Sequence, residues 1–361
     1  MSVKTYQELV ARAFNESRPL SAQWELTFKC NHLCGFCYNA PTGQREMTTA
    51  EIKKGLDKIS EFGVLYLTLT GGEPMVRPDF FEICEYARQL GFALRVYSNG
   101  YLIDEARAKR LKDVQTFEVE ISIHGARPET HDRLTGIRGS FEKVLAALEN
   151  LRTHKIKTNL KCPITHLNQE ELWDIWEIAN RFGTSIAFDP VITPRDDGDK
   201  GPLAMSSTKE FLARFFSDEY KPLRYGREVT KRDDTGIRAN CGTGRTSFTI
   251  DPYGNIYPCV QWRRKWANIK DVENLAELWK TSEVLKHVRW AAEQIPQTTL
   301  KEKESGSFCT FCPGVAELQT GSPFKMYQQA EMVAEARMTA YNAKEQHAPK
   351  LPAGAGTSLQ G

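Results

Sequence analysis

Three cysteines lie close together near the start of the chain, with the spacing C-x3-C-x2-C. Cys30, Cys34 and Cys37 could hold three corners of a four-iron, four-sulfur cluster and leave the fourth iron without a protein ligand. An iron with an open coordination position can do chemistry, whereas a cluster with four protein ligands mostly stores or passes electrons. The triplet therefore indicates a reactive metal site.

A zinc site is the alternative interpretation of the same triplet. Structural zinc takes four ligands, commonly as paired C-x2-C units, so a lone triplet fits it poorly. His32 could serve as a fourth ligand, but it lies between two of the cysteines, where its ring would be cramped. We therefore favour the iron–sulfur interpretation.

The triplet is followed directly by the aromatic Tyr38 and resembles the signature of the radical S-adenosylmethionine (radical SAM) enzymes. In that family, SAM chelates the open iron of a [4Fe-4S] cluster through its amino and carboxylate groups. An electron from the reduced cluster then cleaves the sulfonium and releases a 5′-deoxyadenosyl radical. The resemblance implies that the three cysteines are catalytic and that SAM and the cluster are cofactors.

An alternation of β-rich and amphipathic helical runs between residues 22 and 205 would position this loop. The expected strands are 24–28, 64–70, 94–98, 117–123, 156–164 and 185–192. Thr48 with Glu51, and Asn168 with Glu171, are expected to form capping boxes at two helix starts. Six strand-then-helix units imply a parallel sheet with right-handed crossovers, either open and doubly wound or an incomplete barrel. The resemblance implies the second, an α/β fold with a partial (β/α)6 TIM-like barrel.

Functional residues should gather where such strands end, and short polar motifs follow the second, third and fourth expected strands. Glycines let a backbone approach a ligand closely, and a glutamate can accept a hydrogen bond from an ammonium group. The motif at 71–74 resembles the family's GGEP motif, which binds the amino group of SAM, and the resemblance extends to the polar residues that follow. The residues expected to bind SAM are Tyr38, Gly71, Gly72, Glu73, Pro74, Ser98, Asn99 and Ser122.

The fourth expected strand places polar side chains on one face, because alternate residues of a strand point the same way. Glu118, Glu120, Ser122 and His124 would face the barrel interior, which is costly unless a ligand or network satisfies them. His124 stands where the family commonly has an aspartate. It could orient SAM, touch the substrate or be a satisfied core histidine.

Two more side chains are candidates only. Arg133 lies where an arginine of the family can steady SAM, although a surface arginine is the commoner case. Asp189 could line a substrate cavity or cap the loop that begins with Pro190.

A second group of cysteines lies near the C-terminus. Cys241 and Cys259 flank an expected β-hairpin, and Cys309 and Cys312 form a C-x2-C unit. Four thiolates suit either zinc or an iron–sulfur cluster. The pattern resembles the SPASM/Twitch extension of radical SAM enzymes, which implies an auxiliary [4Fe-4S] cluster on these four cysteines. The remaining Cys84 and Cys162 are expected to be small buried side chains.

Domain boundaries follow from these motifs. We expect an N-terminal helical lead-in (1–21), the partial barrel (22–205), a bridging region (206–235), a small α+β auxiliary cluster domain (236–325) and a C-terminal helix with a disordered tail (326–361).

The composition disfavours a nucleic-acid-binding or membrane-spanning protein. The 361 residues carry 48 basic and 46 acidic side chains, so no global charge favours nucleic acid or an anionic membrane. No apolar run approaches the ~20 residues that span a bilayer. Nine cysteines, mostly clustered, indicate metal ligation in a reducing compartment, so we expect a cytoplasmic protein.

The resemblance leaves the substrate open. Many relatives with SPASM or Twitch extensions crosslink or oxidise ribosomally made peptides, so we favour peptide modification. No leader-recognition module is visible, so we expect a separate leader-binding partner, besides a flavodoxin- or ferredoxin-like electron donor. The enzymatic alternative is oxidative tailoring of a haem-related tetrapyrrole, and the non-enzyme alternative is a zinc-stabilised binding module.

Overall fold

The computed structural model describes residues 5–232 and 239–347. The tail expected at 348–361 lies outside the described residues. Within them, one nine-stranded sheet has the order β6-β5-β4-β3-β2-β1-β7-β8-β9. The strands are β1 (Ser21–Thr27), β2 (Tyr66–Gly71), β3 (Ala93–Ser98), β4 (Glu118–Ser122), β5 (Thr158–Pro163), β6 (Ser185–Asp189), β7 (Ser247–Ile250), β8 (Asn255–Tyr257) and β9 (Ala267–Asn268).

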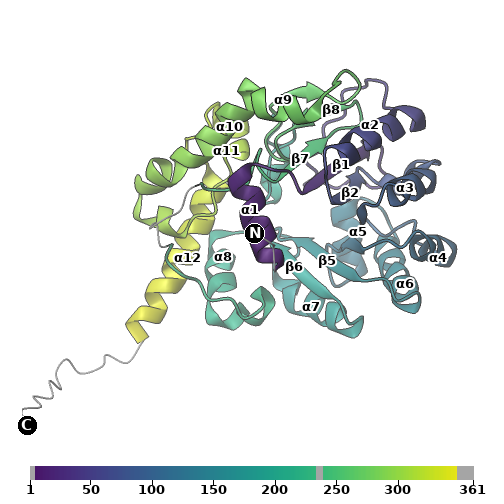
Figure 1. Ribbon diagram of the computed structural model, residues 1–361. Coiled ribbons are helices and arrows are strands. Elements are labelled where there is room, and N and C mark those ends of the chain that lie inside the picture. The colour runs from purple at the N-terminus through teal and green to yellow at the C-terminus, as the bar shows by residue number, and fades with distance from the viewer. Residues whose placement is uncertain (1–4, 233–238, 348–361) are drawn as a thin grey trace, which may run out of the picture.

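The first six strands form the partial barrel that the sequence predicts. Each of β1 to β6 pairs in parallel with its sequence neighbour, as expected when helices return the chain to the start of the sheet. The strand β6 is an edge strand, and β1 pairs on its other side with β7 instead, so the barrel stays open. Figure 1 shows the curved wall of strands with the helices α2 to α7 on its outer side.

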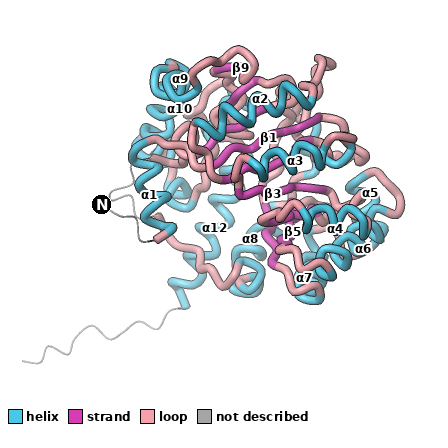
Figure 2. Tube along the Cα trace, turned by 45° about the vertical axis from the view of Figure 1, so that its right-hand side comes forward, coloured by secondary structure: helices cyan, strands magenta, loops and turns pink. Residues whose placement is uncertain are grey.

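Helices cover the sheet, and aliphatic side chains such as Leu67 and Leu69 are fully buried. Figure 2 shows the same arrangement from the side. The barrel helices are α1 (Tyr6–Glu16), α2 (Thr49–Glu61), α3 (Phe80–Gln89), α4 (Glu105–Asp113), α5 (Pro128–Thr135), α6 (Ser140–Thr153) and α7 (Leu172–Arg181). Those after the barrel are α8 (Lys209–Phe216), α9 (Leu275–Thr281), α10 (Glu283–Gln294), α11 (Pro313–Thr320) and α12 (Gln328–His347).

One expected capping box is confirmed and the other is wrong. Thr48 and Glu51 form the box at α2. Asn168 does not cap α7: its side-chain amide binds the backbone of Thr165 and His124 instead. Glu171 accepts from the Ala126 N–H at 2.8 Å, so both side chains tie the end of β4 to the following elements.

The C-terminal extension continues the sheet of the barrel. The strands β7 and β8 form the expected hairpin, and β7 lies parallel to β1. After the extension, α12 packs against α8. Thus the second cysteine group is joined directly to the barrel wall.

Aromatic and cationic side chains fill the N-terminal end of the barrel. The ring of Tyr6, from α1, lies 6.4 Å from the ring of Tyr66, the first residue of β2. The guanidinium of Arg95 lies 5.0 Å from the Tyr66 ring and 5.5 Å from that of Phe117. A cavity lies at the other end, where Thr70, Ser98 and Ser122 mark the C-terminal ends of three strands. In the described ranges, every helix is too short or too polar to cross a bilayer.

Candidate active site

The cysteine loop leaves the C-terminal end of β1 and is anchored by partly buried hydrogen bonds at its base. Glu46 accepts from the Thr27 hydroxyl at 2.8 Å and from the Phe28 N–H at 2.8 Å. Farther along, the Leu33 N–H donates to the carbonyl of Thr135 at 2.7 Å. The loop is thus held at both the strand end and the α5 end, although it has no regular structure.

Burial and mutual repulsion act on the three thiols of this loop. Burial, followed by the charges of Cys37 and Cys30, raises the pKa of Cys34 to about 12. Burial also raises the pKa of Cys37 and of Cys30, and a charge on Cys37 adds to the effect on Cys30. The raised pKa values disfavour three free thiolates, and a bound metal cation would oppose that effect. The donor set therefore fits a thiolate-bound metal cluster.

Two glycines let the β2 loop pack directly against the start of the cysteine loop. A Cβ on Gly71 would overlap the carbonyl oxygen of Thr27, and one on Gly72 would overlap that of Lys29. In the structure, the Gly72 N–H donates to the Thr27 carbonyl at 2.7 Å, and the Glu73 N–H donates to that of Lys29 at 3.0 Å. The glycines thus align two loops that both border the cavity.

Glu73 joins the end of β2 to the end of β3. Its fully buried carboxylate accepts from the Ser98 hydroxyl at 3.0 Å, the Asn99 N–H at 2.8 Å and the Met75 N–H at 3.1 Å. Burial raises the pKa of Glu73 to about 7, against the effect of these donors. Its carboxylate is therefore occupied by groups of this chain and holds Ser98 and Asn99 in place.

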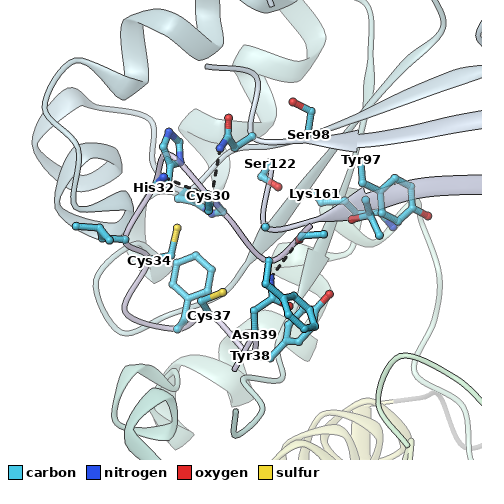
Figure 3. Close-up of a pocket in the computed structure, with 18 of the residues that line it drawn as sticks. Cys30, His32, Cys34, Cys37, Tyr38, Asn39, Tyr97, Ser98, Ser122 and Lys161 are labelled. Carbon is cyan, nitrogen blue, oxygen red and sulfur yellow. Dashed lines mark hydrogen bonds between the residues drawn. The ribbon is translucent and has the colours of Figure 1, made fainter. Parts of the chain in front are cut away.

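A cavity of about 630 Å³ opens beside the cysteine loop and contains most of the predicted site residues (Figure 3). Its volume suits a cofactor-sized ligand. The predicted residues that line it are Cys30, Cys34, Cys37, Tyr38, Gly71, Gly72, Ser98, Asn99 and Ser122. Glu73 and Pro74 are buried behind the wall and are absent from the lining. Asn99 contacts the loop directly, since its amide donates to Asn31 at 2.8 Å and lies 3.8 Å from the Cys30 sulfur.

The opposite wall of this cavity carries charged groups that the sequence analysis named only in part. Glu120 pairs with Lys161 of β5 at 3.2 Å and accepts a hydrogen bond from Tyr97 of β3, and all three line the cavity. Lys161 was not among the predicted site residues, although the alternation of Asn159 and Lys161 along β5 indicates an inward polar face. Glu118 lies below this wall and pairs with Lys157 at 2.8 Å.

Three histidines lie on or next to the cysteine loop: His32 of the loop itself, His124 after β4 and His131 of α5. The His124 ring lies 4.9 Å from that of Phe36 and 5.4 Å from that of His131. Burial lowers the pKa of His124 well below its usual value, and lowers that of His131 and of His32 to about 4. Among the described residues, Nδ1 of His124 has no hydrogen-bond partner. His124 thus lines the cavity with one ring nitrogen unpartnered, which disfavours the alternative of a satisfied core histidine.

Arg133 and Asp189 lie away from the cavity. Arg133 is exposed and does not line the cavity, which matches the commoner case of a surface arginine. Asp189 accepts from the Val191 N–H at 3.0 Å, which is the loop-capping alternative.

A buried ion network joins the cysteine loop to the C-terminal extension. Arg263 donates to both oxygens of Glu25, at 2.9 and 2.7 Å, and lies 2.8 Å from Asp196. The Asp196 N–H in turn donates to the carbonyl of Tyr38 at 2.8 Å. Burial raises the pKa of Glu25 and raises that of Asp196 to about 7. One cation therefore serves two carboxyl groups beside the loop.

Three of the C-terminal cysteines act on one another electrostatically, whereas Cys309 has other charged neighbours. Burial, and after it the charge of Cys259, raises the pKa of Cys241 to about 11 and that of Cys312 to about 12. Cys309 is buried, with its sulfur 3.8 Å from the carbonyl of Ala330. In the part of the chain that the structure describes, no three donors are yet converged on a metal position. Four thiols in one region still fit a cluster, because metal binding commonly closes such ligands around the ion.

The other two cysteines have structural surroundings, as predicted. Cys84 and Cys162 are buried at 0% and 1% exposure in the apolar core.

Comparisons with known proteins bear on both cysteine groups. Residues 24–182 match the sequence model of the radical SAM superfamily, and residues 241–313 match that of SPASM, an iron-sulfur cluster-binding domain. The AdoMet-dependent heme synthase of Methanosarcina barkeri is 28% identical over 75% of this chain and 85% of its own length. The mycofactocin maturase MftC of Mycobacterium ulcerans is 28% identical over 75% of this chain and 77% of its own. The fold resembles that of Streptococcus suis SuiB bound to precursor peptide SuiA, with a TM-score of 0.65 and 16% identity over 91% of this chain and 82% of that one.

Proposed function

Because the chain belongs to the radical SAM superfamily and carries a SPASM iron–sulfur domain, we propose that the cavity beside the cysteine loop is where it binds and cleaves SAM. The protein is a radical SAM enzyme whose cofactors are iron–sulfur clusters and SAM. When bound, they supply a 5′-deoxyadenosyl radical that abstracts hydrogen from a substrate. The observation that carries the proposal is that Cys30, Cys34 and Cys37 line one cavity together with the predicted SAM-binding loops.

Each wall of the cavity has a role in this proposal. The three cysteines hold the cluster, and the backbone of Gly71 and Gly72 borders the bound SAM. The side chains of Asn99 and Ser122 face the cavity and can hydrogen-bond polar groups of SAM. Glu73 acts as a positioning residue, because its carboxylate holds the loop that bears Asn99.

The second cysteine group holds the auxiliary cluster in this proposal. Cys241, Cys259, Cys309 and Cys312 supply four thiolates, which leaves no iron open and favours electron transfer or a structural role over substrate binding. The network of Arg263 ties this domain to the cysteine loop and keeps the two metal sites in a constant relation.

We favour a ribosomally made peptide as the substrate, supported by the likeness to the mycofactocin maturase MftC. A separate leader-binding protein and a flavodoxin- or ferredoxin-like electron donor complete this proposal. A reducing, cytoplasmic setting is consistent with nine cysteines that are all free. The likeness to the AdoMet-dependent heme synthase supports a second candidate, a haem-related tetrapyrrole.

The test of the chemistry is SAM cleavage by anaerobically purified protein after chemical reduction. The wild type should form 5′-deoxyadenosine, and Cys34→Ala should abolish it. Cys84→Ala is the matched control, since Cys84 is a cysteine buried in the core, and it should retain the activity. Normal cleavage by Cys34→Ala would contradict the site assignment.

The test of the substrate class uses a deuterium label, placed either at the 5′ carbon of SAM or on the substrate. A candidate precursor peptide and coproporphyrin are incubated separately with the reduced enzyme, and mass spectrometry follows both products. A mass change in the peptide that depends on SAM supports peptide modification. A change in the porphyrin alone supports the second candidate.

A further inference from the structure

A second cavity, of about 550 Å³, lies at the open edge of the barrel, away from the cysteine loop. One wall is the edge strand β6, with Ala187 and Phe188, and another is the end of α8. The remaining walls are the segments 223–232 and 307–310, and Arg337 of α12. The cavity therefore forms where the barrel, the bridging region and the C-terminal extension meet.

Four arginines from separate segments line this cavity. They are Arg224, Arg227, Arg232 and Arg337. Their described hydrogen bonds go to neutral groups, with Arg232 donating to the carbonyl of Cys309 at 2.9 Å and Arg337 to that of Phe308 at 3.3 Å. Arg224 donates to the carbonyls of Phe215 and Ser217. These bonds orient the guanidinium groups without neutralising them, although the nearby charges of Asp218 and Glu228 act on Arg224.

Among the described lining residues, the acidic side chain is that of Glu228, and it already forms ion pairs with lysines. Glu228 pairs with Lys221 and with Lys344. Among the described residues, no carboxylate lies within ion-pair distance of the four cavity arginines. The deeply buried arginines elsewhere differ, since Arg263 pairs with Glu25 and Arg245 pairs with Glu293.

The cavity arginines also repel one another. Burial lowers the pKa of Arg337; a charge on Cys309 opposes this effect, and the charges of Arg224 and Arg232 add to it. Moreover, Nη1 of Arg232 is buried without a partner in the described part of the chain. Gathering like charges in a partly desolvated space is unfavourable unless an anion joins them.

The other lining groups indicate the chemical class of that anion. Phe215, Phe216, Phe308 and Tyr225 give the cavity aromatic faces, and Tyr225 is 55% exposed at the rim. Guanidinium groups match carboxylates in two-pronged geometry and stack on flat rings. We propose that this arginine-lined cavity is a second binding site, which takes the carboxylates of a ligand with an aromatic or apolar body.

This inference goes beyond the proposed SAM chemistry. The carboxylates could come from an acidic peptide segment or from the side chains of a tetrapyrrole, which share the same recognition chemistry. Arg232 and Arg337 lie nearest Cys309, so they could instead balance the charge of the auxiliary cluster. Arg224 and Arg227 have no cysteine among their described contacts and are the informative positions.

Two probes test the site on the full-length holoenzyme by equilibrium binding, without SAM or reductant. One is coproporphyrin III, and the other is the peptide Ac-Glu-Phe-Glu-Phe with a free C-terminus. The uncharged analogue Ac-Gln-Phe-Gln-Phe-amide is the ligand control. We expect at least one acidic probe to bind, with an affinity that falls as salt is raised. Binding of one probe rather than the other identifies the source of the carboxylates.

Arg224→Gln and, independently, Arg227→Gln should weaken that binding about 10-fold, as expected for loss of a charged hydrogen bond. Arg214→Gln is the matched control, because Arg214 lies in α8, close in sequence to Arg224, but does not line the cavity and pairs with Glu170. Each variant should still cleave SAM in the absence of probe, which separates failure here from failure of the proposed function. The proposal is overturned if neither acidic probe binds, or if both variants bind like the wild type. It is also overturned if Arg224→Gln loses auxiliary iron while its probe affinity is unchanged.

Discussion

Arg263 offers the sharpest test of how the C-terminal extension supports the cysteine loop. Its side chain is 12% exposed and binds Glu25, which is 0% exposed, and Asp196, which is 16% exposed. Arg263→Leu would leave two buried carboxyl groups without their cation. Removing one partner of a buried pair costs about 3–5 kcal/mol, so we expect that loss in the free energy of unfolding near pH 8.

The loss should depend on pH, and its sign follows from the two carboxyl groups. The pKa of Glu25 and that of Asp196 are raised by burial even with Arg263 present, and Arg263 opposes this effect. A carboxyl with a raised pKa in the folded state destabilises the fold increasingly as the pH rises through that pKa. Without the arginine both values rise further, so the deficit of the variant should be larger at pH 8 than at pH 5.5.

Urea unfolding followed by tryptophan fluorescence at both pH values measures this difference. Arg264→Leu is the matched control, because its neighbour Arg264 is 38% exposed and pairs with a 24% exposed Glu317. That pair lies nearer the surface and should be worth about 1 kcal/mol or less. Arg263→Leu combined with Glu25→Leu should recover part of the stability. The argument would be refuted if Arg263→Leu and Arg264→Leu lost the same free energy of unfolding. It would also be refuted if the loss in Arg263→Leu were the same at both pH values.

Three further predictions concern the cavity and the second cysteine group. Gly72→Ala should abolish SAM cleavage, measured as 5′-deoxyadenosine, because the added methyl overlaps the carbonyl of Lys29. Gly43→Ala is the control, because its methyl meets no atom within 4 Å and should cost only about 1 kcal/mol of backbone strain. In the SAM-free protein, burial raises the pKa of Glu73 from 4.5 to about 7. The free energy of unfolding of the wild type should therefore fall by about 3 kcal/mol relative to that of Glu73→Gln as the pH rises across that interval. Unfolding curves in which this difference does not change with pH would contradict the prediction. Cys312→Ala should lose the auxiliary cluster but still cleave SAM, and iron analysis that finds no loss of metal would show that Cys312 is not a ligand.

Local patterns predicted the features that depend on neighbours in the sequence. The triplet Cys30, Cys34 and Cys37 lies on one loop, so its spacing alone places three thiols together. The box of Thr48 and Glu51 forms because both partners belong to the same helix turn. The six strands were also predicted, because each is a short β-rich run with at least one buried apolar residue.

Tertiary contacts decided the features that the sequence did not predict. Asn168 could cap a helix, but its amide instead forms hydrogen bonds with backbone groups of Thr165, His124 and Pro163, at the ends of β4 and β5. Glu73 is oriented by donors from the end of β3, which no local pattern reveals. The arginine-lined cavity draws on segments far apart in the chain, from Arg224 to Arg337, so only the folded structure brings its charges together.

The central claim is that the cysteine loop holds a cluster whose remaining iron is open to SAM. Electron paramagnetic resonance of the reduced Cys241→Ala/Cys312→Ala variant tests it most directly, because the variant should keep only the cluster of Cys30, Cys34 and Cys37. We predict a spectrum of one reduced cluster that changes when SAM is added. A spectrum indifferent to SAM, or the absence of any iron–sulfur signal, would contradict the account.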